Sequence, residues 1–382
     1  MRMIHTSDWH LGRLFFGESL TEEQAALLNE FVAVAKDTKP DVILIAGDVY
    51  DRSVPAADAV ALLDETLTRL VLEHRIPVLM ISGNHDSGQR LAFGSRFFDR
   101  SRLHVYSGVT PGSVRLTDAW GPVDFMLLPY ADTEAVRLEL GSEKATDADA
   151  AIRCRRDCWD AAAVGPGRRV ALAHAFVAGG QPSESERPLS VGGTGAVAAG
   201  HFDGFQYVAL GHLHRPQQLA CGRLTYSGSL MKYSFDEATQ QKGAYCVELD
   251  GDGTVRQEFL PLPSRRDVRT VAGQFQDLMR GPANGENPED YLSITLLDEA
   301  PVIQAIQRLR TVYPKTMEIN YRYQQEAISF SPDRRSDRPA LSGLELFEAF
   351  AGWSTQKPLT EQQRTTIAGI MDEVVSAGGE FR

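Results

Sequence analysis

The sequence lacks long hydrophobic runs and has few cysteines. No apolar stretch approaches the roughly 18 residues that span a bilayer. The opening residues, MRMIHTSDWH, contain no apolar segment followed by the small-residue cleavage site of a secretory signal. Only 4 of the 382 residues are cysteines, and Cys154 and Cys158 lie four apart in a helical stretch rather than in a disulfide framework. We therefore expect a cytoplasmic protein with buried, reduced thiols.

Positive charge is also scarce. The chain carries 39 Lys and Arg residues against 51 Asp and Glu residues, which gives a net charge of −12. A protein with this balance does not bind polyanions over its whole surface. Any role on nucleic acid must therefore depend on local basic clusters, bound metal ions or a partner. The hydrophobic share of 43% is ordinary for a globular protein and excludes a disordered chain.

Apolar runs and amphipathic stretches alternate over the first two thirds of the chain. The runs lack strict polar alternation, which is typical of strands buried on both faces. The stretches between them repeat apolar residues at helical spacing. This order predicts an α/β layered domain. The predicted strands cover residues 3–4, 42–46, 77–81, 170–173 and 207–210, and the predicted helices cover residues 22–36 and 58–73.

The composition changes after residue 260. Prolines interrupt residues 260–264, which indicates a hinge, and a second small α/β unit follows. A charged, proline-bounded linker precedes two helical segments of about 40 residues in all, too short to form their own core. These segments must dock on the chain itself or on another protein. We expect a first domain at 1–262, a capping domain at 263–332, a linker at 333–340 and docking helices at 341–382.

Polar residues follow nearly every predicted strand of the first domain. The carboxyl ends of strands in an open α/β sheet share one edge, so we expect these residues to converge. A single such motif is explained equally well by a surface turn, but five in order favour a functional site. The clusters are Asp8-Trp9-His10, Gly47-Asp48-Val49-Tyr50-Asp51, Gly83-Asn84-His85-Asp86, His174 and Gly211-His212-Leu213-His214.

Carboxylates, imidazoles and an amide oxygen together form a ligand set for Mn²⁺, Fe²⁺ or Zn²⁺. The set is too large for one ion, but two ions roughly 3.5–4 Å apart, sharing one carboxylate, would use it. A pair of ions suits phosphate ester hydrolysis because it polarises phosphoryl oxygens and lowers the pKa of water. Gly47, Gly83 and Gly211 allow tight turns directly before the ligands.

The five motifs match those of the calcineurin-like metallophosphoesterases one for one. The surrounding sequence at residues 5–12, 207–216, 226–229 and 234–237 resembles the SbcD branch, the bacterial nuclease subunits related to the double-strand-break-repair nuclease. The resemblance is close up to about residue 260 and looser beyond it. It implies a four-layer α/β sandwich with a small α/β capping domain and a C-terminal helical segment that binds a partner.

The resemblance also implies roles for individual residues. Asp48 would bridge the two ions, while His85 would not be a ligand but would assist the departing oxygen, which fits an imidazole that titrates near neutrality. Asp51 would orient His85 through its other ring nitrogen, although a solvated turn carboxylate is a fair alternative. The implied ligands are Asp8, His10, Asp48 and His214 for one ion, and Asp48, Asn84, His174 and His212 for the other.

Three residues near these motifs have competing interpretations. We expect His5, inside the first strand, to be a hydrogen-bonded packing residue. Trp9 would either stack on a base or, as we favour, pack against a neighbouring loop. Arg52 would contact phosphate or, as we favour, lie on the surface.

The same resemblance implies the partners and the reaction. The expected partners are DNA, an SbcC-type SMC-like ATPase that binds the C-terminal helices, and a second copy that packs through residues 58–73 and 91–98 within a heterotetramer. Arginines at 265–338 would contact DNA. Acidic residues in the same range roughly cancel their charge, so an ordinary solvated surface explains these arginines almost as well. The C-terminal helices would alternatively pack back on the chain.

We expect a nuclease of double-strand-break processing, associated with the nucleoid. It would act as an exonuclease on duplex ends and an endonuclease on hairpins or single strands, with Mn²⁺ as the first expectation and Mg²⁺, Fe²⁺ or Zn²⁺ not excluded. A phosphatase or small-molecule phosphodiesterase with this core would not need the roughly 120 residues after position 260. Intact ligands speak against a third possibility, an inactive scaffold of the same fold.

Overall fold

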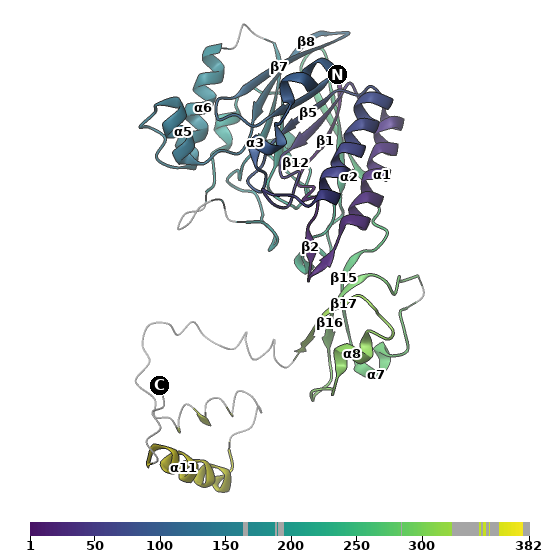
Figure 1. Ribbon diagram of the computed structural model, residues 1–382, viewed down its shortest axis with the longest axis vertical. Coiled ribbons are helices and arrows are strands. Elements are labelled where there is room, and N and C mark those ends of the chain that lie inside the picture. The colour runs from purple at the N-terminus through teal and green to yellow at the C-terminus, as the bar shows by residue number, and fades with distance from the viewer. Residues whose placement is uncertain are drawn as a thin grey trace. The chain divides into compact units, whose positions relative to one another are not determined.

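Figure 1 shows the computed structural model of the chain. It describes residues 1–162, 167–187, 189, 195–283, 285–322, 344, 347–348, 351 and 359–376. The chain divides into two compact units. The first holds Met1–Thr270 with Asn284–Leu292, and the second holds Val271–Ala283 with Ser293–Arg382.

The first unit is built on two six-stranded sheets. The first sheet has the order β14-β13-β1-β4-β5-β6, with a parallel core of β1, β4, β5 and β6 and two antiparallel strands on the β1 side. Its strands are β1 (Arg2–Thr6), β4 (Val42–Ala46), β5 (Val78–Ile81), β6 (Leu103–Tyr106), β13 (Gly243–Leu249) and β14 (Val255–Pro261).

The second sheet has the order β11-β12-β10-β9-β8-β7. Strands β8, β9, β10 and β12 are parallel, and the edge strands β7 and β11 are antiparallel to their neighbours. The strands are β7 (Gly112–Asp118), β8 (Gly121–Leu128), β9 (Arg168–His174), β10 (Tyr207–Gly211), β11 (Gln217–Leu219) and β12 (Leu224–Tyr226).

The core lies between the two sheets. Leu44 and Leu79 of the first sheet and Phe125 and Leu172 of the second belong to one buried cluster. The outer face of the second sheet packs on α6 (Ala148–Ala162) through residues that include Trp159. Figure 1 shows α1 (Thr21–Thr38) and α2 (Ala57–Leu67) together on the opposite side of the unit from α5 (Thr133–Leu140) and α6. The unit is therefore a four-layer α/β sandwich, as the resemblance implied.

This arrangement corrects one expectation. The five predicted strands all form, but three belong to the first sheet and two to the second, so their ends do not share the edge of a single sheet. Each strand is apolar on both sides because one face packs on helices and the other on the opposing sheet. The polar clusters converge because corresponding edges of the two sheets lie against each other.

Two smaller expectations also change. The helix predicted at 58–73 is α2 up to Leu67 and then a π-helix over Thr68–Glu73. The four cysteines form no disulfide, as predicted, but they are not buried: Cys158 and Cys221 are exposed, and the other two are half-buried. The short helices α3 (Gly88–Leu91) and α4 (Ser95–Phe98) and the hairpin β2 (Leu14–Phe15) and β3 (Glu18–Ser19) complete the first unit.

A three-stranded sheet of order β15-β16-β17 follows the hinge. Its strands are β15 (Val268–Gly273), β16 (Tyr291–Leu296) and β17 (Thr316–Tyr321), accompanied by the helices α7 (Phe275–Leu278) and α8 (Ala305–Leu309). The expected second α/β unit thus forms. Helix α11 (Glu361–Ser376) matches the last predicted helix, whereas the predicted linker and most of the preceding helix lie outside the described residues. Within the described residues, no helix is both long and apolar enough to cross a membrane.

Candidate metal centre

The predicted ligands meet where the two sheets face each other. Asp8 and His10 follow β1, Asp48 follows β4 and Asn84 follows β5, while the second sheet supplies the remaining histidines. The loops are tightly constrained, because Asp8, His10, Asp48 and His212 all have positive φ angles of 46–108°. Such backbone conformations cost free energy in non-glycine residues and concentrate at functional sites.

Asp48 lies between two groups of these side chains. Its Oδ2 atom is 3.7 Å from His10 Nε2 on one side and 3.6 Å from His174 Nε2 on the other. His10 Nε2 in turn lies 3.0 Å from His214 Nε2. Asp8 belongs with His10 and His214 to one cluster of candidate ligand atoms, and with Asp48 and His174 to another.

Asn84 completes the second group. Its Oδ1 atom lies 2.8 Å from His174 Nε2 and 3.3 Å from His212 Nδ1. His174 Nδ1 donates to the carbonyl oxygen of Ala46 at 2.8 Å, and since that oxygen can only accept, Nδ1 carries the proton. The lone pair of His174 therefore lies on Nε2, which faces the centre.

Three glycines make this convergence possible. A Cβ atom would lie 2.5 Å from His174 Nδ1 at Gly47, 2.1 Å from Asp48 Oδ1 at Gly83 and 2.0 Å from the carbonyl oxygen of Ala46 at Gly211. Gly211 belongs to the second sheet and Ala46 to the first. A side chain at position 211 would therefore force the two sheets apart beside the ligands.

The electrostatics of the centre fit a pair of divalent cations. Burial, and then the charge of Asp48, raises the pKa of Asp8 well above its ordinary value, and burial raises the pKa of Asp48 to about 6. Burial lowers the pKa of His174 to about 4 and that of His10 well below its usual value. His10 Nδ1 is buried without a hydrogen-bond partner. Neutral imidazoles and crowded carboxylates are the donors that a transition metal binds, and its charge would offset theirs.

His85 lies beside this centre. Its main-chain N–H donates to Asp48 Oδ1 at 2.8 Å, and its Nε2 lies 3.9 Å from Asp48 Oδ2. Its Nδ1 donates to Asp51 at 2.9 Å, but the acceptor is the main-chain carbonyl oxygen rather than the carboxylate. The Asp51 carboxylate instead lies 3.3 Å from Arg13 Nη1 and 3.7 Å from His10 Nδ1.

Sequence reasoning missed a buried network behind His214. Ser185 Oγ lies 2.5 Å from His214 Nδ1 and donates to Glu237, whose other carboxylate oxygen is 2.6 Å from Lys242 Nζ. Burial alone would raise the pKa of Glu237, but Lys242 and His214 lower it overall. Glu237 was noted only as part of a resembling stretch, and neither Ser185 nor Lys242 follows a strand in a recognisable motif.

A second missed carboxylate joins two ligand loops. Asp86 accepts the main-chain N–H groups of Gly83 at 2.8 Å, Tyr50 at 2.9 Å and Val49 at 3.1 Å. It thereby fixes the loop that carries Asp48 against the loop that carries Asn84. The Gly-Asn-His-Asp motif includes Asp86, but the motif alone did not predict that its carboxylate would connect the two loops.

The structure supports the favoured interpretation of each of the three residues near the motifs. His5 and Trp9 pack inside the unit, and Arg52 lies on the surface. The prediction for His5 is confirmed, since its ring bonds Tyr207 Oη at 2.8 Å and the Leu210 carbonyl oxygen at 3.2 Å. Trp9 is fully buried, donates to Thr6 Oγ1 at 2.9 Å and meets Phe31 edge to face, so it packs in the core. Arg52 is largely exposed, 3.6 Å from the Asp51 carboxylate.

Comparison with known families agrees with this geometry. Residues 1–216 match the model described as calcineurin-like phosphoesterase. The chain belongs to that family. Residues 264–352 match the SbcD_C model, described as the type 5 capsule protein repressor C-terminal domain. The calcineurin-like domain followed by this second domain supports the resemblance to the SbcD branch.

Several solved structures are distantly similar. TT1561 of Thermus thermophilus is 16% identical with a TM-score of 0.38, over 68% of this chain and 98% of that chain. A dimetal phosphatase from Danio rerio is 13% identical with a TM-score of 0.41, over 69% and 97%. GAP50, the anchor in the inner membrane complex of Plasmodium, is 11% identical with a TM-score of 0.39, over 89% and 98%. Family membership rests on the sequence matches.

Proposed function

We propose that the protein is a metal-dependent DNA nuclease, the nuclease subunit of an SbcC–SbcD-type complex that processes double-strand breaks. It would act as an exonuclease on duplex ends and an endonuclease on hairpins or single strands, and its substrate would place it at the nucleoid. The observation that carries the proposal is the pair of candidate ligand clusters that share Asp8, with Asp48 between His10 and His174 and with His85 beside them. The SbcD_C match after the phosphoesterase domain favours a nuclease over a phosphatase.

Two divalent ions, with Mn²⁺ as the first candidate, would polarise the phosphodiester and supply a nucleophile from water at neutral pH. The proposed ligands divide around Asp48. They are Asp8, His10, Asp48 and His214 for one ion, and Asp48, Asn84, His174 and His212 for the other. Mg²⁺, Fe²⁺ and Zn²⁺ remain candidates because the same donors accept them.

His85 is the proposed general acid. The carbonyl oxygen of Asp51 holds the proton on Nδ1, which fixes the ring and leaves Nε2 to face the centre. Burial lowers the pKa of His85, while Asp48 and the Asp51 carbonyl oppose that shift and favour the imidazolium. As an imidazolium, the ring donates its Nε2 proton to the departing alkoxide oxygen of the nucleotide. Asp51 positions His85 through its main chain.

The capping domain would contact DNA through arginines that are paired with carboxylates in this structure. Arg266 pairs with Glu23 and lies 3.5 Å from Glu289, and Arg269 Nε lies 2.7 Å from Asp290. Phosphate groups would have to replace these carboxylates. The net negative charge of the chain also opposes binding of DNA by the protein surface alone. DNA affinity would therefore depend on the bound ions and the ATPase partner.

Exposed apolar side chains support the proposed protein partners. Phe93 and Phe97, in and beside the short helices α3 and α4, are 83% and 81% exposed, and Leu72 at the end of the π-helix is 63% exposed. We propose that this surface binds a second copy of the chain. On α11, Ile370 is 55% exposed, which supports docking of the C-terminal helices on the SbcC-type ATPase.

The test is cleavage of linear duplex DNA by the full chain with Mn²⁺, alone and with the ATPase partner. Wild-type protein should degrade the DNA and Asp8→Ala should not. Hydrolysis of phosphomonoesters without DNA cleavage would favour the phosphatase. Absence of bound Mn²⁺ at micromolar concentration would favour the inactive scaffold.

A further inference from the structure

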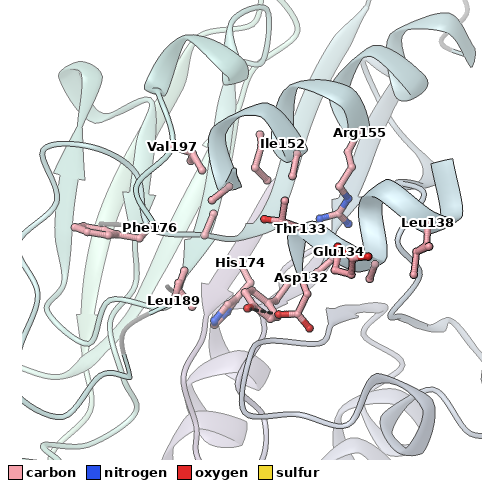
Figure 2. Close-up of a pocket in the computed structure, with 17 residues that line it drawn as sticks. Asp132, Thr133, Glu134, Leu138, Ile152, Arg155, His174, Phe176, Leu189 and Val197 are labelled. Atoms are coloured by element: carbon pink, nitrogen blue, oxygen red, sulfur yellow. Dashed lines mark hydrogen bonds between the residues drawn. The ribbon is translucent and has the colours of Figure 1, made fainter. Parts of the chain in front are cut away.

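A cavity of about 650 Å³ opens beside the metal centre. His174 is common to both, because its Nε2 atom faces Asn84 and its ring also lines the cavity. Figure 2 shows the cavity between the end of β9, the loop after β8, and helices α5 and α6. A group attached to a phosphate at the centre would therefore lie next to it. The volume falls within the range of about 300–1,000 Å³ that small-molecule sites occupy.

The lining of this cavity is apolar with acidic acceptors at one side. Leu138 of α5, Ile152 of α6 and Leu189 supply apolar surface. Tyr130 Oη donates to Asp132 Oδ1 at 2.9 Å, which leaves the second carboxylate oxygen of Asp132 as an acceptor. The cavity thus suits a flat, uncharged group that carries N–H donors.

An anion does not fit the same cavity. Asp132 and Glu134 bring carboxylates to it, and both side chains are exposed. Among the described lining residues the one cation is Arg155, which is only 1% exposed and whose guanidinium donates to the carbonyl oxygens of Val109 at 2.6 Å and Pro129 at 2.7 Å. These carbonyl groups occupy the donors that a phosphate would need.

The wall of the cavity is linked to the metal centre. Arg155 fixes Pro129, and the next residue, Tyr130, donates its main-chain N–H to the carbonyl oxygen of Ser82 at 3.0 Å. Ser82 leads directly into the loop that carries Asn84 and His85. The position of the cavity relative to the reacting groups is therefore set by hydrogen bonds within the fold.

We infer that this cavity binds one unpaired nucleobase of the strand being cut, the base next to the scissile phosphate. A nucleobase is flat, uncharged and carries N–H donors, and the apolar side chains of the lining offer its faces a surface to pack against. The base would leave its stack as its phosphate reaches the metal centre. This inference rests on the proposed nuclease function.

Cleavage of single-stranded oligonucleotides tests the inference. One abasic position is moved along the strand, and cleavage at each bond by the full chain with Mn²⁺ is quantified. Wild-type protein should cut the bond beside the abasic position roughly tenfold more slowly than the intact bond, since a stacked base contributes strongly to binding. Leu138→Trp, which fills the cavity from an exposed position, should cut both bonds at similar rates. Glu139→Trp, on the same helix but outside the lining, should behave as wild type.

A binding measurement distinguishes failure of the base-binding inference from failure of the proposed nuclease function. An oligonucleotide with 2-aminopurine at the same position is mixed with Mn²⁺ and protein that carries His85→Ala, which should keep both ions without turnover. Emission should rise with His85→Ala alone and with Glu139→Trp added as the base unstacks, and should stay flat with Leu138→Trp added. Equal cleavage of intact and abasic bonds, or an emission rise that Leu138→Trp retains, overturns the inference while leaving the nuclease function standing. An emission rise without any cleavage by wild-type protein would instead reject the nuclease function and support base binding.

Discussion

At the scale of single residues, the proposed function gives metal binding and proton transfer to different histidines. His212 Nδ1 faces Asn84, whereas His85 is bonded through Nδ1 to a carbonyl oxygen and through its main chain to Asp48. Two histidines that look alike in the sequence are thus held for different tasks. The distinction is testable by substitution.

We predict that His85→Ala retains both ions and loses turnover by about 10²–10⁴-fold, the usual contribution of a general acid. His212→Ala should instead bind one ion weakly, because a ligand is removed. Metal content by mass spectrometry, with cleavage rates for the same samples, checks both. Loss of metal from His85→Ala would show that His85 is a ligand and would reject its assigned role.

Asp51 leads to a second prediction. Because its carbonyl oxygen holds His85, Asp51→Ala should keep that hydrogen bond and lose the carboxylate contacts with Arg13, His10 and the exposed Arg52. We expect roughly a tenfold loss of activity, typical of a residue that orients a metal ligand, and weaker Mn²⁺ binding. Titration calorimetry with Mn²⁺ and turnover measurements check it. If Asp51→Ala is as inactive as His85→Ala and binds Mn²⁺ normally, the carboxylate itself acts on His85.

At the scale of elements, the approach of the two sheets depends on glycine. Gly211→Ala would place a methyl group 2.0 Å from the Ala46 carbonyl oxygen, so strand β10 or β4 must move. We predict a loss of about 1–3 kcal/mol in the free energy of unfolding, as in other overpacked sites, together with weaker Mn²⁺ binding. Denaturant unfolding checks this.

Gly167→Ala is the matched control, because nothing lies within 4 Å of a Cβ at that position. Its stability should stay within about 0.5 kcal/mol of wild type. A Gly211→Ala protein as stable as this control would show that the sheets can separate without cost.

The strands and the ligands were predictable for the same physical reason. Apolar runs such as 42–46 mark strands buried on both faces, and the polar residues directly after them are the proposed ligands. The run does not reveal what covers each face, so the division into two sheets was missed. Strand β7, with its alternating burial, had no such run. Glu237 and Ser185 were missed because their contacts with His214 join loops distant in sequence.

At the scale of the whole molecule, the exposed aromatic surface around α4 predicts association. We expect Phe97→Glu to convert a dimer into a monomer, because the buried charge would oppose packing of two apolar surfaces. Ile303→Glu, equally exposed in a different unit, is the control and should leave the mass unchanged. Sedimentation or light scattering checks the masses. A wild-type monomer at micromolar concentration would contradict this prediction.

The division of the ligands between the sheets has one more consequence. The first sheet provides Asp8, His10, Asp48 and Asn84, and the second provides His174, His212 and His214. Under the proposed assignment, each ion takes ligands from both, so coordination would add a cross-link between two halves of the domain that packing and a few hydrogen bonds, such as His174 to Ala46 and His5 to Tyr207, already join. Relative sliding of those halves is then limited to the tolerance of a coordination bond.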